Sequence, residues 1–224
     1  MPTEPAIFLH PSRALAAAGG LLLVFAVLAV VVTNDHRLGV DNTWWRWMGD
    51  GRTTLLTDLS KVLNDLGGFV LQLVVRLAVA IVLAVRGWGR RLVAWAFVAL
   101  LSTPICAMMK AMVDRQRPAG GLVHAGGASF PSGHALAAAV TAIGIVLALT
   151  VPGRARLVGA VFAGAYAVVM AWSRTELGVH WLTDVVAGSA LGAALTIGAF
   201  AIVDQVATRR ARSRVITSRS VGLR

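Results

Sequence analysis

Charged residues are scarce in this chain. Asp, Glu, Lys and Arg together make up 14% of its 224 residues, whereas 57% are apolar. About a quarter of the residues of a typical soluble domain are charged, so the composition excludes that class and predicts an integral membrane protein. Linkers rich in proline, serine or charge are also missing, and we therefore expect a single membrane-embedded domain over residues 1–224.

Cysteine is nearly absent. The only one, Cys106, lies within an apolar stretch. A single cysteine excludes an intrachain disulfide and leaves the redox compartment open, so we expect Cys106 to be a small packing residue.

Long apolar runs dominate what is present. Six of them approach the length of about 20 residues that a helix needs to cross a bilayer. The first is not followed by a small-x-small cleavage site, so we interpret it as an uncleaved span. The pattern predicts an all-α bundle of six transmembrane helices, with a core over about residues 14–203 and both termini on one side. The runs are 14–33, 67–85, 91–109, 132–151, 157–172 and 181–203.

Basic residues are unevenly divided between the two sets of loops that six spans create. One set holds twelve, against the acids Glu4 and Asp204, and the other holds eight that acids nearly balance. Basic residues favour cytoplasmic loops, so the first set and both termini are predicted to be cytoplasmic. The twelve are Arg13, Arg86, Arg90, Arg91, Arg154, Arg156, Arg209, Arg210, Arg212, Arg214, Arg219 and Arg224. The eight are Arg37, Arg46, Arg52, Lys61, Lys110, Arg115, Arg117 and Arg174.

The basic residues of the predicted cytoplasmic loops and tails account for most of the net charge of +11. We expect the basic tail over about residues 204–224 to meet anionic lipid headgroups at the cytoplasmic surface, rather than nucleic acid.

The segment between the first two runs has a pattern of its own. Trp44, Trp45 and Trp47 favour the headgroup level of a membrane, and apolar residues recur at helical spacing from Leu55 to Leu66. We predict a short interfacial helix, either a brace or a lip that guides a lipid. Its opposite side is polar, with Asp58, Lys61, Asn64 and Asp65.

Three short blocks combine cations, histidines and a carboxylate, and all three fall at the predicted non-cytoplasmic ends of spans. They read Lys110-x6-Arg117-Pro118, Pro131-Ser132-Gly133-His134 and Ser173-Arg174-x5-His180-x3-Asp184. Phosphoryl transfer needs positioning and neutralisation of the phosphate oxygens, and these residue types supply both. Each block alone has an ordinary explanation, such as a snorkelling pair or a serine N-cap, so the inference depends on their convergence.

The first two blocks have an expected geometry. Lys110 and Arg117 share one face if the third helix continues outward as far as Pro118. Ser132 and Gly133 bring the unpaired amides of a helix N-terminus to an anion.

The third block holds a potential nucleophile. His180 and Asp184 are spaced i to i+4 at the start of the sixth span, so the carboxylate can accept the proton of one ring nitrogen and leave the other free to attack. Arg174 can bind phosphate oxygens in bidentate fashion. Near the blocks the only other acids are Asp114 and Glu176, which predicts chemistry without a metal or other cofactor.

Together the blocks resemble the signature of the type 2 phosphatidic acid phosphatase family, and the six-helix layout extends the resemblance over nearly the whole chain. The resemblance implies that His180 forms a phosphohistidine, Asp184 orients it, and His134 protonates the leaving oxygen and later activates water. The phosphate-binding set that it implies is Lys110, Arg117, Ser132, Gly133 and Arg174.

A site at the outer membrane face favours a lipid phosphate. The resemblance leaves phosphatidic acid, phosphatidylglycerol phosphate and polyprenyl diphosphate open. Arg115 and His124 either contact a second phosphate or are solvated loop residues, with Arg115 paired to Asp114. Vanadate-dependent haloperoxidases share the phosphate pocket, but they are soluble. A catalytically silent protein that binds lipid phosphates or acts as a scaffold is the alternative, although His134, His180 and Asp184 are all present.

Two features lie outside the blocks. Arg76 is near the middle of the second run, where a charge is costly and implies a function or a partner that the sequence does not identify. Gly188 and Gly192 in the sixth run predict close helix packing, within the chain or in a dimer, and the oligomeric state stays open.

Overall fold

The computed structural model describes residues 4–36 and 38–221, with side chains as far as residue 210. Over these residues the regular structure consists of eight α-helices. They are α1 (Pro11–Asn34), α2 (Gly39–Asp50), α3 (Thr54–Leu66), α4 (Phe69–Val85), α5 (Gly89–Val113), α6 (Gly133–Leu149), α7 (Arg154–Glu176) and α8 (Leu182–Val221).

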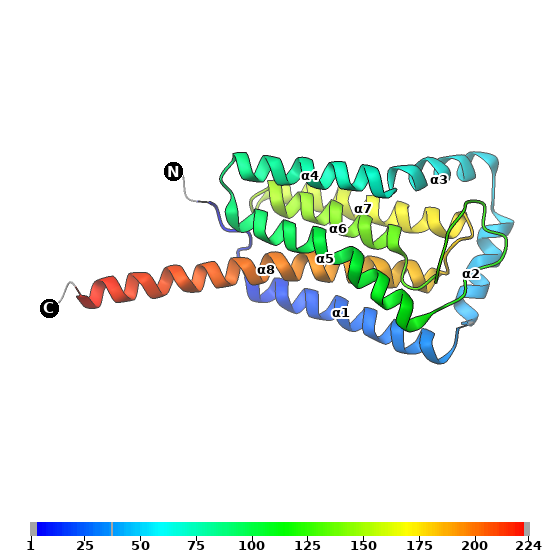
Figure 1. Cartoon of the computed structure of the whole chain (residues 1–224), viewed down its shortest axis with the longest axis horizontal. Coiled ribbons are helices and arrows are strands. Elements are labelled where there is room, and N and C mark those ends of the chain that lie inside the picture. Colours follow the sequence, from blue (N-terminus) through cyan, green and yellow to red (C-terminus); the bar gives the residue numbers. More distant parts are fainter. Residues whose placement is uncertain (1–3, 37, 222–224) are drawn as a thin grey trace.

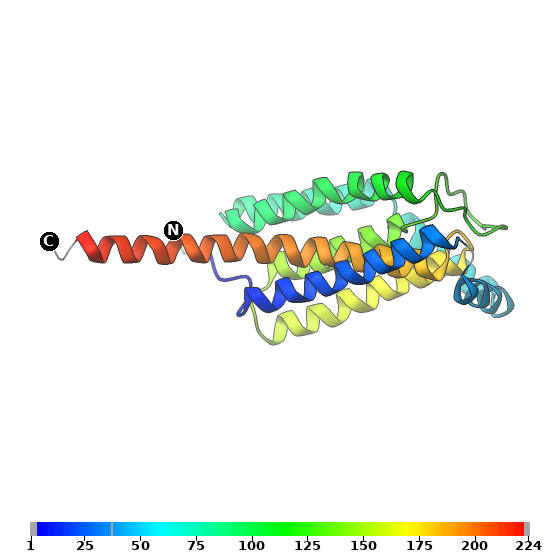
Figure 2. The same cartoon turned by 90° about the horizontal axis from the view of Figure 1, so that it is seen from below.

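Helix α8 is the centre of the bundle and packs against α1, α5, α6 and α7. Figure 1 shows the N-terminal segment and the free end of α8 at one end of the bundle, together with the short connections between α4 and α5 and between α6 and α7. Helices α2 and α3 and the segment 114–132 lie at the other end (Figures 1 and 2). The two ends of the bundle are therefore formed by different segments: the termini and short connections at one, and α2, α3 and the segment 114–132 at the other.

All six predicted runs form helices, which confirms the all-α membrane fold. Four of them, α1, α5, α7 and α8, are long and apolar enough to cross a membrane alone. Helices α3 and α4 pass the same test as one pair bent by 52°, and α6 is an apolar helix of 17 residues. Length and composition thus support four or five spans, and the predicted number of six is not confirmed.

Helix α8 is much longer than the predicted sixth span, which ended at Val203. It continues to Val221 because no glycine or proline interrupts the chain between Asp204 and that residue. The part of α8 beyond residue 203 extends away from the bundle (Figure 2). Of the residues counted for orientation, Arg37 and Arg224 lie outside the described residues.

The segment 35–66 forms two helices where one was predicted. The tryptophan cluster lies on α2, and the apolar repeat forms α3, which packs against α7. Thr53 caps α3, since its side chain accepts a hydrogen bond from the amide of Leu56 at 3.3 Å. Gly67 and Gly68 separate α3 from α4 at the bend.

Glycines of α8 bring its backbone close to α6. A Cβ on Gly192 would lie 2.6 Å from the carbonyl oxygen of Leu136, and a Cβ on Gly188 would overlap the carbonyl oxygen of Ser132. The predicted close packing therefore occurs within the chain, and it fixes the start of α6 against α8. Cys106 is buried in the apolar core beside these helices, as expected.

Partly buried ion pairs hold together the end of the bundle that contains the termini. Asp204 of α8 accepts hydrogen bonds from the amides of Ile7 and Phe8, at 3.2 and 2.9 Å, and lies 3.4 Å from Arg90. Glu4 pairs with Arg90 at 3.4 Å. Part of the positive charge at this end is thus used in tertiary contacts.

Candidate active site

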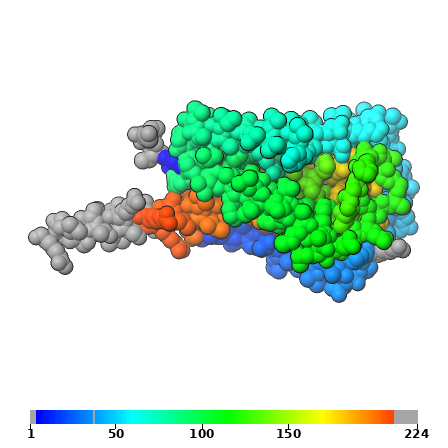
Figure 3. Space-filling model, in the orientation of Figure 1, coloured from blue at the N-terminus to red at the C-terminus, as the bar shows by residue number. Residues whose placement is uncertain are grey.

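The three predicted blocks converge at the end of the bundle that lies away from the termini. Lys110 lies in the last turn of α5, Ser132 precedes α6, Arg174 lies in the last turn of α7, and Asp184 lies in the first turn of α8. Figure 3 shows a hollow at this end, where yellow atoms of the α7 region are visible between α3 and the segment 114–132. Groups separated by more than 70 residues in the chain therefore surround one site.

His180 lies at the bottom of the site, with 4% of its surface exposed. Its Nδ1 is 3.4 Å from Oδ2 of Asp184, which also accepts a hydrogen bond from the amide of Trp181 at 2.9 Å. The separation is at the long end for a hydrogen bond, and Nδ1 has no acceptor with hydrogen-bond geometry among the described residues. His180 precedes α8 by two residues, so the pair was correctly predicted but does not share a helix face.

Burial decides the protonation state of His180. Loss of solvation lowers the pKa of His180 to about 4, although the charge and hydrogen bond of Asp184 act in the opposite direction. The imidazole is therefore neutral at pH 7, which is the form that a nucleophile requires.

Arg117 lies against the other ring nitrogen of His180, Nε2. Its Nη1 is 3.1 Å from Nε2 of His180 and donates a hydrogen bond to the carbonyl oxygen of Val179 at 2.7 Å. Its other nitrogens donate to the carbonyl oxygens of Gly126, Gly127 and Ala128. Burial lowers the pKa of Arg117, and the charge of Asp184 opposes this effect.

Lys110 and Arg117 do not share a helix face, contrary to prediction. Helix α5 ends at Val113, because Asp114 adopts a left-handed conformation with φ of 45° and turns the chain. The two cations nevertheless meet, since Lys110 Nζ donates to the carbonyl oxygen of Ala128 at 2.5 Å and Arg117 Nη2 donates to the same oxygen at 3.2 Å.

The second block forms the N-terminus of α6, as predicted. The Ser132 hydroxyl oxygen accepts a hydrogen bond from the amide of Ala135 at 3.5 Å, so it is the N-cap. Gly133 is the first helical residue, and the amides of this turn lack intrahelical acceptors. The amide of Ser132 donates to the carbonyl oxygen of Asp184 at 3.0 Å, which ties this block to the third.

Asn64 is one of the residues of the candidate site that escaped prediction. Asn64, placed on the polar side of the interfacial helix, instead contacts the site from the end of α3. Its Oδ1 accepts a hydrogen bond from Arg174 Nη1 at 2.7 Å, and its carbonyl oxygen lies 3.3 Å from Nε2 of His134. The spacing of Asn64 from the apolar repeat carries no signal for this contact, because it depends on how α3 bends onto α7.

The expectation for Arg115 was wrong. This side chain is neither solvated nor paired with Asp114, and it is too deeply buried to reach a second phosphate, with 1% of its surface exposed. It contacts Asp184 at 2.7 Å and Asp41 of α2 at 2.6 Å. Asp41 is thus a further acid near His180, one that the sequence did not indicate.

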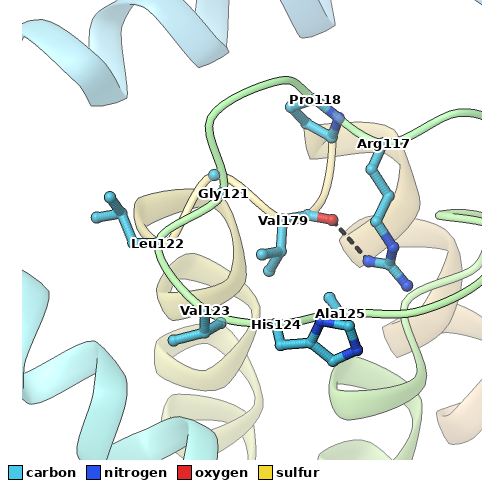
Figure 4. A pocket seen from close by; sticks show the side chains of 9 residues that line it. Arg117, Pro118, Gly121, Leu122, Val123, His124, Ala125 and Val179 are labelled. Carbon is cyan, nitrogen blue, oxygen red and sulfur yellow. Dashed lines mark hydrogen bonds between the residues drawn. The ribbon is translucent and has the colours of Figure 1, made fainter.

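His124 is exposed on the segment 114–132. It lines a surface pocket of about 470 Å³ together with Arg117, and Figure 4 shows both side chains on its wall. His124 lies outside the network of hydrogen bonds that joins the three blocks.

Over the described residues, no group of three or more His, Cys, Asp or Glu side chains is arranged to hold a metal ion. The acids nearest the site are committed to arginines, since Glu176 lies 3.8 Å from Arg52 and Asp184 pairs with Arg115.

Fold and site together define a phosphatase held in a membrane by apolar helices. A family model described as the PAP2 superfamily matches residues 91–207, which is just over half of the chain, and the chain therefore belongs to this superfamily. The predicted family and the predicted enzyme class, a lipid phosphatase, are confirmed.

Relatives support the same assignment. Phosphatidylglycerophosphatase B of Bacillus subtilis (strain 168) is 29% identical over 179 residues, which cover 77% of this chain and 87% of that protein. The crystal structure of a transmembrane PAP2-type phosphatidylglycerolphosphate phosphatase from Bacillus subtilis has a TM-score of 0.70 at 24% identity, covering 86% of this chain and 96% of that one. Aquifex aeolicus LpxE has a TM-score of 0.60 at 21% identity, covering 74% and 97%. At these identities the two structures show the common fold.

Proposed function

We propose that this protein hydrolyses the phosphate or diphosphate of a lipid without a metal ion, through a phosphohistidine on His180, at the extracytoplasmic surface. The supporting observation is the arrangement around Nε2 of His180. This nitrogen has Arg117 at 3.1 Å, while Asp184 lies on the opposite side of the ring at Nδ1. A neutral imidazole with one nitrogen oriented by a carboxylate has the form of an activated nucleophile.

The first chemical step forms one bond and breaks another. Nε2 of His180 attacks phosphorus, the bond from phosphorus to the ester oxygen breaks, and His134 gives its proton to that oxygen. Lys110, Arg117 and Arg174, with the hydroxyl of Ser132 and the amide of Gly133, neutralise the phosphate oxygens as in-line transfer requires.

The second step restores the enzyme. His134, now neutral, takes a proton from a water molecule whose oxygen attacks phosphorus, and the bond from phosphorus to Nε2 of His180 breaks. Inorganic phosphate leaves. His134 thus acts first as a general acid and then as a general base.

A groove between α4 and α5 supports a lipid substrate. Its volume is about 530 Å³, its walls are mainly apolar, and it reaches Gly133 and His134 at the site. Arg76 also lines it and donates hydrogen bonds to the carbonyl oxygen of Ala99 at 3.1 Å and to Ser102 at 3.4 Å. These neutral acceptors are the partners that the sequence left unnamed. An apolar channel ending at the proposed general acid suits a substrate whose phosphate is joined to a hydrocarbon chain.

The proposed topology has six spans in one membrane-embedded domain, with a core over about residues 14–203. Both termini and the basic tail are cytoplasmic, and the site is on the opposite face. The charge asymmetry supports this orientation, and both chain ends leave the same end of the bundle (Figure 1). A reporter fused after Arg224 should have its cytoplasmic activity, and an external signal would reverse the topology.

Three lipids are candidates for the substrate: phosphatidylglycerol phosphate, phosphatidic acid and polyprenyl diphosphate. The Bacillus subtilis relative is a phosphatidylglycerophosphatase by name, which places phosphatidylglycerol phosphate first. A phosphate-release panel in detergent should include these three lipids and a soluble phosphate ester.

Variants of two site residues complete this panel. His180→Ala should release no phosphate and form no acid-labile phosphoenzyme, and Asp184→Asn should be strongly impaired. Near-normal turnover by purified His180→Ala would exclude the phosphohistidine mechanism. A native enzyme that releases phosphate from none of these compounds would instead favour a silent phosphate-binding protein.

A further inference from the structure

Beneath His180 lies a chain of three buried charges that does not line the phosphate site. Arg115 Nη1 donates to Oδ1 of Asp184 at 2.7 Å, and Arg115 Nη2 donates to Oδ2 of Asp41 at 2.6 Å. No side chain of the three is more than 1% exposed. Charges this deeply buried are costly unless each is paired, so the three hold one another in place.

Each oxygen of the two carboxylates accepts at least one hydrogen bond. Asp41 accepts hydrogen bonds from the amide of Thr183 at 2.9 Å and from its hydroxyl at 2.7 Å. Asp184 receives Arg115 on Oδ1 and the amide of Trp181 on Oδ2, the oxygen that faces His180. With these contacts made, Asp184 has one orientation, and Oδ2 remains directed toward the ring nitrogen.

Arg115 is held as firmly as its partners. Its Nε and Nη2 donate to the carbonyl oxygen of His36, at 3.2 and 3.1 Å, and its Nη1 also donates to the hydroxyl of Thr183 at 2.8 Å. The guanidinium lies 5.5 Å from the centre of the Trp181 ring. A lysine donates from a single nitrogen and cannot reproduce this planar fork.

The net charge of these three buried side chains indicates a function for Asp41. Arg115 alone would cancel the charge of Asp184, whereas two carboxylates around one guanidinium leave a net charge of −1 below His180. Attack by Nε2 on phosphorus makes the imidazole ring positive, and a fixed negative charge at Nδ1 stabilises that state. Asp41 is therefore needed if Asp184 is to act on His180 as a free carboxylate would.

We propose that Arg115 and Asp41 are positioning residues for the reaction, which orient Asp184 and preserve its negative charge toward His180. The inference rests on the proposed phosphohistidine mechanism. Asp41 belongs to α2, which lies outside the residues matched by the family model, so this part of the site is supplied by the N-terminal part of the chain.

Kinetics of Asp41→Asn and Arg115→Met test the proposal. Each variant should lower kcat by about tenfold to a hundredfold, with KM for a short-chain lipid phosphate changed by less than about twofold. Arg115→Lys, which keeps the charge but loses the fork, should fold more readily and fall between Arg115→Met and the native enzyme. If the kcat of Asp41→Asn were within about twofold of the native value, the network would have a structural role only and the proposal would be rejected.

Asp204→Asn is the matched control. It removes an equally buried carboxylate paired with an arginine, but at the other end of the bundle. It should lower the unfolding temperature as Asp41→Asn does and leave kcat unchanged. A loss of kcat in this control as large as in Asp41→Asn would show that loss of buried charge, and not position, is responsible.

A spectroscopic measurement separates this inference from the proposed function. In ¹⁵N-histidine NMR of the full chain in micelles, the His180 signal is identified by its loss in His180→Ala. The native ring should carry its proton on Nδ1, and Asp41→Asn should shift this tautomer toward Nε2–H. An unchanged tautomer would overturn the positioning role. A shifted tautomer in a protein without phosphatase activity would retain that role and reject the proposed function.

Discussion

Asn64 and Arg174 join α3 to the candidate active site through a hydrogen bond of 2.7 Å between Oδ1 and Nη1. Arg174 is buried, and its Nε has no partner among the described residues. The neutral amide of Asn64 therefore holds a cation in place without cancelling its charge, which leaves that charge available for a phosphate. Helix α3 also lies outside the matched residues 91–207, as α2 does.

Asn64→Asp should weaken substrate binding. A carboxylate at this position would form a charge-assisted pair with Arg174 and compete with the phosphate oxygens, so we expect KM to rise by about tenfold. Initial rates over a range of lipid phosphate concentrations measure the effect. Asn34→Asp adds the same charge at an exposed position on α1 and should leave KM unchanged. Equal KM values for native protein and Asn64→Asp would show that Arg174 does not bind the phosphate.

Gly188→Ala should damage both stability and activity. The added methyl group would overlap the carbonyl oxygen of Ser132, which is backbone and cannot rotate away. Overpacking of this kind costs about 1–3 kcal/mol, and relief requires α6 to move with Ser132 and Gly133 at its start. Thermal unfolding and kcat/KM measure the two effects. Gly20→Ala, with open space around the new methyl group, is the control, and equal behaviour of both variants would contradict the packing argument.

The acid limb of the pH profile should lie well below the ordinary histidine range. In the proposed mechanism the neutral form of His180 is the nucleophile, and burial lowers the pKa of His180 to about 4. Protonation therefore removes activity only as the pH falls toward about 4, and kcat/KM should show no loss near 6.5 from this group. Profiles for a monophosphate and a diphosphate separate the ionisation of the substrate, which moves between them, from that of His180. A limb near 6.5 for both substrates would contradict the assignment.

The same pKa shift affects folding. Because the unfolded chain binds a proton at His180 near pH 6.5 and the folded chain only near 4, this group makes folding less favourable as the pH falls between these values.

Chelation should leave turnover intact. The proposed site neutralises phosphate with Lys110, Arg117 and Arg174, so EDTA at millimolar concentration is expected to change kcat by less than about twofold. Purified protein assayed before and after dialysis against the chelator provides the measurement. Loss of activity that Mg²⁺ restores would require a metal ligand set different from the site proposed here.

Much of the architecture follows from local signals in the sequence. Each of the six apolar runs forms a helix, since burial of apolar side chains in a membrane and saturation of backbone hydrogen bonds both act over a single segment. Contacts within a single block could be predicted for a similar reason. Ser132 is an N-cap and His180 lies near Asp184 because only a few residues separate the groups concerned.

Only the tertiary structure decided how distant segments complete the site. Arg115 was expected either at a second phosphate or in solvent, but the left-handed turn at Asp114 directs the chain so that this arginine is buried between Asp184 and Asp41. Asn64 was expected on a polar helix face, but α3 packs on α7 and brings it to Arg174. Composition and periodicity determine which segments form helices and which residue types can handle phosphate. The partners of a buried charge depend instead on turns and helix crossings between segments, because pairing in space, and not spacing in the chain, offsets the cost of burying it.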